Sequence, residues 1–207
     1  MKITILGSGN IGGTLGKKWS SAGHEVIFGV RRPDSAEMQA FLRDMDGQAS
    51  AADLGSAITR GEVIVFALPG TVVESVVSAH AAALDGKLVI DATNRFGTAE
   101  VSNVRTIRAQ APGAKVFRAF NSLGWENFAA PQFEDIQVDL FYCGPGGDDQ
   151  EVVEQLISDI GLRPVRVGDL DQLRLVDSLG ELWVTLVFRQ GWDRRIAFKV
   201  LAAKKIG

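Results

Sequence analysis

Short apolar, β-branched segments alternate with amphipathic segments along most of the chain. The apolar runs predict strands at residues 2–6, 25–29, 63–68, 87–91, 115–120, 140–144 and 163–167, with a weaker strand at 48–51. The amphipathic runs predict helices at residues 11–22, 35–45, 53–59, 71–82, 101–111 and 149–160. Strands that are apolar on both faces and alternate with helices indicate a parallel sheet covered on both sides. The pattern therefore predicts an α/β fold with a Rossmann-type, doubly wound, mostly parallel sheet of about eight strands.

The periodicity changes after residue 167. Apolar side chains from Leu170 to Val187 recur at steps of three and four, which predicts one long helix. A shorter, basic helix is expected at residues 192–205. Residues 168–207 are too few to form a hydrophobic core of their own. We therefore expect a sheet domain at residues 1–167 and a C-terminal helical extension at 168–207 that belongs to the same structural unit.

A glycine-rich segment joins the first predicted strand to the first predicted helix. It fits the spacing G-x-G-x-x-G and consists of Gly7, Ser8, Gly9, Asn10, Ile11 and Gly12. In a dinucleotide-binding site the first glycine permits a tight turn, the second leaves room for the pyrophosphate, and the third lets the helix pack against the strand. The amides of residues 8–11 would then face the phosphates at the helix N-terminus. The alternative is an ordinary strand-to-helix turn that is rich in glycine.

Two consecutive arginines, Arg31 and Arg32, follow the second predicted strand. An NAD site usually carries Asp or Glu here, about 20 residues after the glycine loop. The nearest upstream acid, Glu25, lies at the opposite end of the strand. Guanidinium groups bind a 2′-phosphate and stack on adenine, whereas a carboxylate would repel that phosphate. The pair therefore favours NADP(H) and makes residues 1–167 an NADP-binding domain; the alternative is two solvated surface arginines.

The carboxyl ends of three further strands offer candidates for the nicotinamide and acceptor side, because ligands in such sheets bind beyond these ends. Leu68 and Pro69 would offer an apolar wall and backbone carbonyls to the nicotinamide ribose. Asn94 and Asn121 could hydrogen-bond a carboxamide or an acceptor. The alternative for each asparagine is the capping of a turn.

A proton donor for carbonyl reduction is not evident in the sequence. The chain has no Tyr-x-x-x-Lys pair, and His24 is expected at the opposite end of the sheet. Asp91 follows a strand and could serve as an acid if buried, but helix capping is the favoured interpretation. We therefore assign no catalytic residue. A chain without an acid suits an acceptor that collects its proton from water, such as a flavin or a deazaflavin.

Composition and charge limit the ligand classes and the cellular compartment that we expect for this chain. The chain has 207 residues, a formal net charge of −3, one cysteine and two histidines. The charge gives no bias toward nucleic acid, and the few Cys and His residues give no metal-ligand cluster. No apolar run approaches the roughly 18 residues of a membrane span. We therefore expect a protein of the reducing cytoplasm that binds no metal, nucleic acid or membrane.

Aromatic and basic side chains in the second half have two interpretations each. Trp125, Trp183 and Trp192 could line an acceptor pocket, although packing in the core or at a subunit interface is favoured for Trp183. The basic residues near the C-terminus could bind phosphate or a membrane surface, but a solvated helix face is favoured. These basic residues are Arg194, Arg195, Lys199, Lys204 and Lys205.

Taken together, these motifs resemble the family of NADP oxidoreductases that use coenzyme F420. The resemblance covers nearly the whole chain, and its most specific parts are Gly23-His24-Glu25-Val26, Gly29-Val30-Arg31-Arg32, Gly161-Leu162-Arg163-Pro164, Gly168-Asp169-Leu170 and the run Arg174-Leu175-Val176-Asp177-Ser178-Leu179. It implies hydride transfer between NADPH and a deazaflavin, with Arg31 on the 2′-phosphate. It also implies that the C-terminal segment helps to build the acceptor site and a homodimer.

The segments on the acceptor side depart from this family. The family's serine before the first arginine is Val30 here, and residues 91–97 and 119–128 are more similar to the cytoplasmic reductase domains of membrane ferric reductases. We therefore predict an NADPH-dependent oxidoreductase that transfers a hydride to a flat redox cofactor, with F420 first and a flavin (FMN or FAD) second. The alternatives are a reductase of a small imine or carbonyl, and a non-catalytic module that senses NADP(H).

Overall fold

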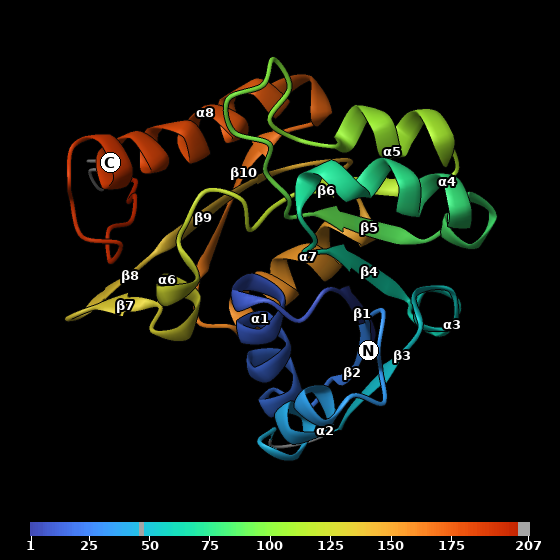
Figure 1. Ribbon diagram of the computed structural model, residues 1–207. Coiled ribbons are helices and arrows are strands. Elements are labelled where there is room, and N and C mark those ends of the chain that lie inside the picture. The colour runs from blue at the N-terminus through green and yellow to red at the C-terminus, as the bar shows by residue number, and fades with distance from the viewer. Residues whose placement is uncertain (46–47, 203–207) are drawn as a thin grey trace.

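A central eight-stranded sheet organises the chain in the computed structural model, which describes residues 1–45 and 48–202 (Figure 1). Its strands are β1 (Lys2–Leu6), β2 (Glu25–Gly29), β3 (Ala49–Ala52), β4 (Val63–Phe66), β5 (Leu88–Asp91), β6 (Lys115–Arg118), β9 (Asp139–Cys143) and β10 (Arg163–Gly168). The helices that cover it are α1 (Asn10–Ser21), α2 (Ala36–Arg43), α3 (Leu54–Arg60), α4 (Val73–Leu84), α5 (Val104–Gln110), α7 (Asp148–Asp159) and α8 (Leu173–Val184). The predicted strands and helices of residues 1–168 are all present, with shifted ends.

The strand order confirms the predicted fold class. The sheet runs β10-β9-β6-β5-β4-β1-β2-β3, and the six strands from β3 to β6 are parallel. That part has the Rossmann order, which reverses between β1 and β4. β9 joins β6 in the antiparallel direction and pairs with β10 in parallel. The carboxyl ends of β1, β2, β4, β5 and β6 therefore meet at one edge of the sheet.

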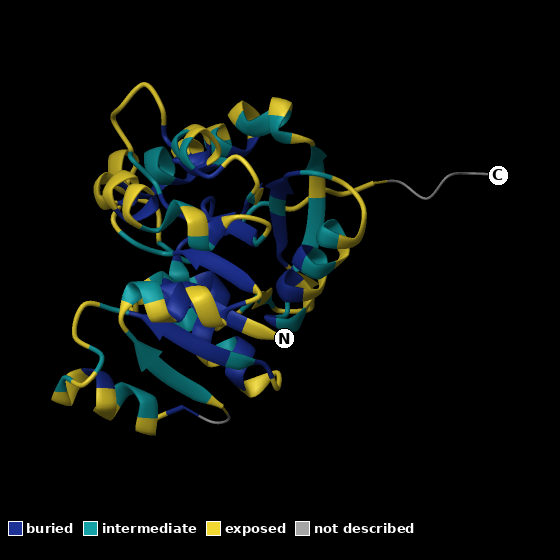
Figure 2. Ribbon diagram, turned by 90° about the vertical axis from the view of Figure 1, so that its right-hand side faces the viewer, coloured by how far each residue is buried: buried dark blue, intermediate teal, exposed yellow. Residues whose placement is uncertain are grey.

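Each face of the sheet buries its own apolar cluster. On β1, Ile3 and Ile5 pack in the cluster beneath α1 and α7, whereas Leu6 joins the cluster beneath α3, α4 and α5. Side chains alternate between faces along a strand, so apolar residues at adjacent positions require helices on both sides. Figure 2 shows buried strands between helices whose outer surfaces are exposed.

The predicted helix from Leu170 to Val187 is observed as one continuous helical run. It begins with a single 3₁₀ turn, η2 (Leu170–Gln172), continues as α8, and ends with a π-helical turn, η3 (Thr185–Arg189). The apolar face of α8 buries Val176 and Trp183 against the sheet domain. This helix lies along the sheet end that carries β9 and β10 (Figure 1).

The prediction of a basic helix at residues 192–205 is wrong for residues 192–202, which contain no helix; residues 203–205 lie outside the described part. Residues 190–202, the C-terminal arm, run along the body instead. The Asn127 side chain donates to the carbonyls of Arg194 and Ile196, both at 3.2 Å, and Arg195 donates to the carbonyl of Gln132. These tertiary hydrogen bonds replace those of a helix, which explains why local periodicity misled the prediction.

The connection from β6 to β9 contains elements that the sequence pattern did not predict. A short helix, α6 (Trp125–Ala129), is followed by the hairpin strands β7 (Gln132–Phe133) and β8 (Ile136–Gln137). These elements span two to five residues, too few to show a hydrophobic period. The C-terminal arm packs against these elements and hydrogen-bonds with them.

Candidate functional site: a dinucleotide cleft and a buried arginine

The glycine loop follows β1 and opens α1, as the sequence predicted. Gly7 has a φ of +101°, and its N–H donates to the carbonyl of Gly29 at 3.0 Å. A Cβ at Gly7 would lie 2.6 Å from the Ala67 carbonyl oxygen, and one at Gly12 would lie 2.2 Å from the Gly7 carbonyl oxygen. These two glycines are therefore required by the fold itself.

Gly9 differs from its neighbours because nothing in the protein requires it. A Cβ at this position would meet no atom within 4 Å, and the backbone has an ordinary extended conformation (φ −71°). Gly9 is also the N-cap of α1, where no side chain caps the helix and the first turn carries no acid. The amides at the start of α1 are thus left for an anion, and a side chain at Gly9 would stand in the space beside them.

A cleft of about 950 Å³ opens at the carboxyl ends of β1, β2 and β4. The predicted residues that line it are Gly7, Ser8, Gly9, Arg31, Arg32, Leu68 and Pro69. Asn10, Ile11 and Gly12 form the first turn of α1 behind this surface and do not line it. The volume lies in the range of small-molecule and cofactor sites, and the cleft joins a phosphate-binding helix start to two arginines.

The end of the cleft that carries Arg31 and Arg32 also contains an acid, which was not predicted because it does not directly follow a strand. Glu37 lies in the first turn of α2 and lines the cleft with Ser35, which caps that helix. Hydrogen bonds from its own backbone amide and from Ser35, together with the charge of Arg32, lower the pKa of Glu37. Glu37 is therefore a carboxylate whose charge interacts with that of Arg32 at this end of the cleft.

The opposite wall of the cleft is apolar. Leu68 and Pro69 follow β4, and they line the cleft with Leu54, Val72 and Val76. The sequence analysis found the first two residues from the strand end. It missed the other three because they come from the starts of α3 and α4, where nothing in the local pattern distinguishes a lining residue from a core residue. This wall suits the flat apolar face of an adenine or nicotinamide ring.

Asn94 and Asn121 do not line the cleft; they belong to a buried polar network around Arg118. The Asn94 side chain accepts a hydrogen bond from Arg118 Nη2 at 2.7 Å and donates to the carbonyl of Asn121 at 2.9 Å. Asn121 in turn donates to the carbonyl of Val176 on α8 at 3.3 Å. Both asparagines therefore bind protein groups that are distant in sequence, so neither caps a local turn through these hydrogen bonds.

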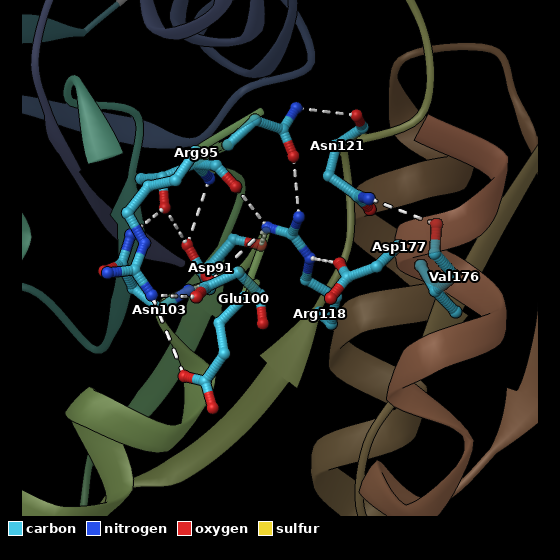
Figure 3. Close-up of polar contacts among 11 residues, drawn as sticks. Asp91, Arg95, Glu100, Asn103, Arg118, Asn121, Val176 and Asp177 are labelled. Atoms are coloured by element: carbon cyan, nitrogen blue, oxygen red, sulfur yellow. Dashed lines mark hydrogen bonds and ion pairs between the residues drawn. The ribbon is translucent and has the colours of Figure 1, made fainter. Parts of the chain in front are cut away.

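Arg118 is fully buried and is satisfied by groups from two segments, residues 91–94 and α8 (Figure 3). Its Nε donates to Asp177 Oδ1 at 2.8 Å, and its Nη1 donates to the carbonyls of Asp91 and Thr93. Asp91 lies 3.4 Å from Arg118 and also accepts from the backbone N–H of Asn103 at the start of α5. Asp91 thus joins the start of α5 to Arg118, and we call Asp91, Asn94, Arg118, Asn121 and Asp177 the Arg118 network.

The sequence analysis missed Arg118 and Asp177. The one available signal was a charged residue inside an otherwise apolar strand run, since Arg118 ends the segment Lys115-Val116-Phe117-Arg118. Burial raises the pKa of the Asp177 carboxyl above its usual value, and the guanidinium of Arg118 opposes that rise. A buried guanidinium is stable only when its donors and charge are matched, so these partners are specific.

The tryptophans do not form an acceptor pocket in the described structure. Trp183 is buried against the core, and its indole N–H donates to the Ile196 carbonyl at 3.2 Å, so the packing interpretation is confirmed. Trp192 is 57% exposed on the C-terminal arm. None of Trp125, Trp183 and Trp192 lines the dinucleotide cleft.

Within the described residues, no group of three or more His, Cys, Asp and Glu side chains could hold a metal ion. His24 lies at the far edge of the sheet, as expected, and its Nε2 is 2.8 Å from Asp159 Oδ2. None of the helices in the described ranges is both long and apolar enough to cross a bilayer.

Comparison with known proteins finds a family that the cleft-bearing part of the chain resembles. Residues 2–95 match the model of a family described as NADP oxidoreductase, coenzyme F420-dependent. This match spans just under half of the chain. An F420-dependent NADP reductase of Methanothermobacter thermautotrophicus is 25% identical over 213 residues, which cover 91% of this chain and 90% of that protein. The predicted family resemblance is thereby confirmed.

Other relatives share a smaller part of their length with this chain. Metalloreductase STEAP3 of Rattus norvegicus is 27% identical over 184 residues, or 86% of this chain and 36% of that protein. A glycerol-3-phosphate dehydrogenase of Prosthecochloris aestuarii is 34% identical over 102 residues, or 44% of this chain and 31% of that protein. The chain spans about a third of the length of these two relatives. The expected similarity to metalloreductases is therefore found alongside that to NADP oxidoreductases.

Solved structures share the fold. A provisionally assigned F420-dependent NADP reductase from Arthrobacter sp. FB24 has a TM-score of 0.84 at 24% identity and covers 98% of this chain and 100% of that one. A hypothetical protein from Sinorhizobium meliloti has a TM-score of 0.70 at 27% identity, covering 83% and 86%. A reductive aminase from Aspergillus terreus has a TM-score of 0.64 at 22% identity, covering 93% and 68%. The Arthrobacter likeness extends over the C-terminal helical run as well as the family domain.

The family match covers one part of the site. Its matched residues contain the glycine loop, the arginine pair and the Leu68–Pro69 wall. Arg118, Asn121 and Asp177 lie beyond residue 95, outside the matched region. The acceptor side of the molecule is therefore described by the structure rather than by the family match.

Proposed function

We propose that this chain is an NADPH-dependent oxidoreductase that transfers a hydride between NADP(H) and a flat redox cofactor, with coenzyme F420 the first candidate and a flavin the second. The observation that carries the proposal is the single cleft that joins an uncapped helix start to Arg31 and Arg32. A dinucleotide with a 2′-phosphate carries negative charge at both of these places, at its pyrophosphate and at its ribose phosphate.

The residues present fit NADP(H). The amides of residues 8–11 would hold the pyrophosphate, and the open space at Gly9 gives that group its clearance. Arg31 would bind the 2′-phosphate, with Arg32 beside the adenine, while Leu68 and Pro69 would hold the nicotinamide end against the strand edge. When bound, NADPH supplies the hydride; the chain orients it and excludes water from one ring face.

The acceptor is proposed from two observations. The residues that line the cleft include no His, Lys or Tyr, and the pKa of the Glu37 carboxyl among them is lowered, so a carbonyl would find no ready proton donor there. A deazaflavin or flavin collects its proton from water and needs only ring-to-ring placement. The Methanothermobacter relative, which this chain covers almost fully, is an F420-dependent NADP reductase, and on that support we propose F420 before FMN or FAD.

Arg31→Ala tests the cofactor assignment. We expect the Kd for NADPH to rise roughly 10- to 100-fold and the Kd for NADH to change little, because a charge-assisted contact to phosphate contributes about 1.5–3 kcal/mol. Arg43→Ala is the matched control, since Arg43 ends the neighbouring α2 and does not line the cleft. Fluorescence titration gives both constants. Equal losses for the two dinucleotides would contradict the assignment.

Turnover distinguishes the proposed activity from its alternatives. NADPH oxidation is followed with F420, FMN, FAD and a set of small imines. We expect turnover with a flavin-like ring. Turnover with imines alone would establish the imine-reductase alternative, and tight NADPH binding without turnover of any acceptor would establish the sensing module.

We further propose a homodimer in the cytoplasm. Leu175 and Leu182 are 43% and 45% exposed and, with the half-buried Leu179 and Leu186, form an apolar stripe at steps of four, three and four along α8 and η3. A second copy of the helix would cover this stripe, which we call the α8 stripe. The lone Cys143 is free and buried, as suits a reducing compartment.

A further inference from the structure

The Arg118 network forms a closed polar circuit between the sheet and α8. Asp177 on α8 binds Arg118 at the end of β6, and Arg118 binds Asn94 after β5. Asn94 donates to the Asn121 carbonyl, and Asn121 donates back to the carbonyl of Val176, the residue beside Asp177. The circuit therefore joins two loops at the carboxyl edge of the sheet to one turn of the C-terminal helix (Figure 3).

Because the circuit is buried, each of its charged groups requires its partner. The Arg118 side chain is fully buried, and that of Asp177 is 13% exposed. Removing one partner of a buried ion pair leaves an unmatched charge in a poorly solvated place, which destabilises the arrangement of the segments around it. Close packing adds to this constraint, because a Cβ at Gly180 of α8 would lie 3.1 Å from the Asn121 carbonyl oxygen. The loops after β5 and β6 are thus held in one arrangement by contacts from α8.

The circuit borders the nicotinamide end of the cleft. Pro69 lines the cleft, and the next residue, Gly70, packs against the Asn94 segment: a Cβ at Gly70 would lie 2.8 Å from the Asn94 carbonyl oxygen. The Asn121 Oδ1 atom is buried and has no partner among the described residues. The network therefore fixes the backbone on which an acceptor beside the nicotinamide would rest.

We propose that Arg118 and Asp177 are positioning residues for hydride transfer. Through Asn94 and Asn121 they hold the loops after β5 and β6 at the angle that sets the acceptor ring against the nicotinamide. This inference rests on the proposed function and deepens it, because it assigns the geometry of the acceptor side to an ion pair between β6 and α8. Neither residue touches the reacting atoms; each acts through the loops.

Asp177→Asn is the first variant, since it removes the charge and keeps the size. We expect kcat/KM for the acceptor (F420 or FMN as probe) to fall about tenfold or more, because a small misplacement of reacting rings has that effect. The Kd for NADPH should stay within about twofold, since the glycine loop and Arg31 are separate from the network. Asp177→Glu keeps the charge and should restore most of the activity.

The control for a loss of stability is Asp159→Asn, which breaks the ion pair with His24 at the opposite edge of the sheet. It should change the free energy of unfolding without changing kcat/KM. Arg118→Lys is the second network variant if Asp177→Asn folds poorly. Amide hydrogen exchange gives a readout independent of turnover: both network variants should raise exchange at residues 92–96 and 120–123 and leave residues 7–12 unchanged.

The outcomes separate the two proposals. If the wild-type protein reduces neither F420 nor a flavin, the proposed function fails and takes this inference with it. If the wild type is active and Asp177→Asn keeps its acceptor kcat/KM, the inference alone is overturned. Parallel losses of NADPH affinity and acceptor turnover, or a failure of Asp177→Glu to recover activity, also overturn it, because they indicate a general structural role.

Discussion

At the residue scale, each glycine of the loop serves a different need. Gly7 and Gly12 make room for protein atoms, whereas the space beside Gly9 is open. The structure separates the two glycines that build the turn from the one beside the space proposed for the pyrophosphate. This difference is testable because folding and binding can be measured independently.

We predict opposite effects for two alanine variants. Gly12→Ala should lower the free energy of unfolding by about 1–3 kcal/mol, because its Cβ would lie 2.2 Å from the Gly7 carbonyl oxygen and 3.0 Å from Ile5 Cγ2. Gly9→Ala should change that free energy by less than about 0.5 kcal/mol, yet raise the Kd for NADPH at least tenfold, roughly 1.4 kcal/mol. Chemical denaturation and fluorescence titration check the pair. Wild-type NADPH affinity in Gly9→Ala would contradict the assignment of the loop.

At the element scale, the C-terminal arm shows that contacts between charged side chains and the body of the protein can hold a segment without helical hydrogen bonds. Its basic residues, expected on a solvated helix face, bind the body instead. Lys199 Nζ lies 2.7 Å from Asp139 Oδ1, and the backbone N–H of Val200 donates to Asp139 Oδ2 at 2.8 Å. Arg195 stacks over Phe133 at 4.6 Å from the ring centroid. The fold of the arm is therefore set by acceptors on β9 and the hairpin.

The attachment of the arm should depend on pH through Asp139. Desolvation raises the pKa of this carboxyl, but hydrogen bonds from Arg163, Lys199 and Val200 outweigh it and hold the pKa below the usual value. A depressed pKa means that the carboxylate stabilises the folded arm above the unfolded-state pKa of about 3.9 and that this contribution is lost as pH falls through the folded value.

We therefore expect hydrogen exchange, corrected for its intrinsic pH dependence, to increase at residues 196–200 below about pH 4. Asp139→Asn is the control, because it should show raised exchange at neutral pH and little further change on acidification. Identical pH profiles for the wild type and this variant would show that another group controls the arm.

At the scale of the whole molecule, α8 has two roles on two adjoining surfaces. One face binds the sheet domain through Val176, Asp177 and Trp183, and the other carries the α8 stripe. A helix that pairs with a second copy on one side and with Arg118 on the other would connect the dimer to the acceptor side. The proposed homodimer is thus adjacent to the proposed site.

Leu182→Glu tests the dimer. A charge at the centre of the α8 stripe would have to be desolvated in the interface, so we expect the variant to be monomeric where the wild type is dimeric. Light scattering coupled to size exclusion measures both masses. Ile136→Glu is the matched control, since Ile136 is 54% exposed on the β7–β8 hairpin, away from α8. A monomeric wild type, or a dimeric Leu182→Glu, would refute this interface.

The features of the fold that were predicted correctly are each defined by residues that lie close together in the sequence. Alternating runs and the glycine-rich turn are each defined by neighbouring residues, so their local pattern was sufficient to predict the strands, the helices and the turn after β1. The ends of elements moved where tertiary contacts intervened: β6 stops at Arg118, and Phe120 just beyond it has a φ of +61°. The short elements between β6 and β9 have no pattern to detect.

The sequence by itself determined the Rossmann class, the position of the cleft and the bias toward a phosphorylated dinucleotide, because hydrophobic period and loop chemistry are local properties. Only the tertiary structure decided the rest. Arg118 and Asp177 are 59 positions apart, and their pairing depends on how α8 packs across the sheet. The roles of Asn94 and Asn121 and the path of the C-terminal arm likewise depend on partners that no local pattern specifies. Burial makes those partners obligatory, since an unmatched charge or amide inside the fold costs free energy that the chain recovers only by bringing distant segments together.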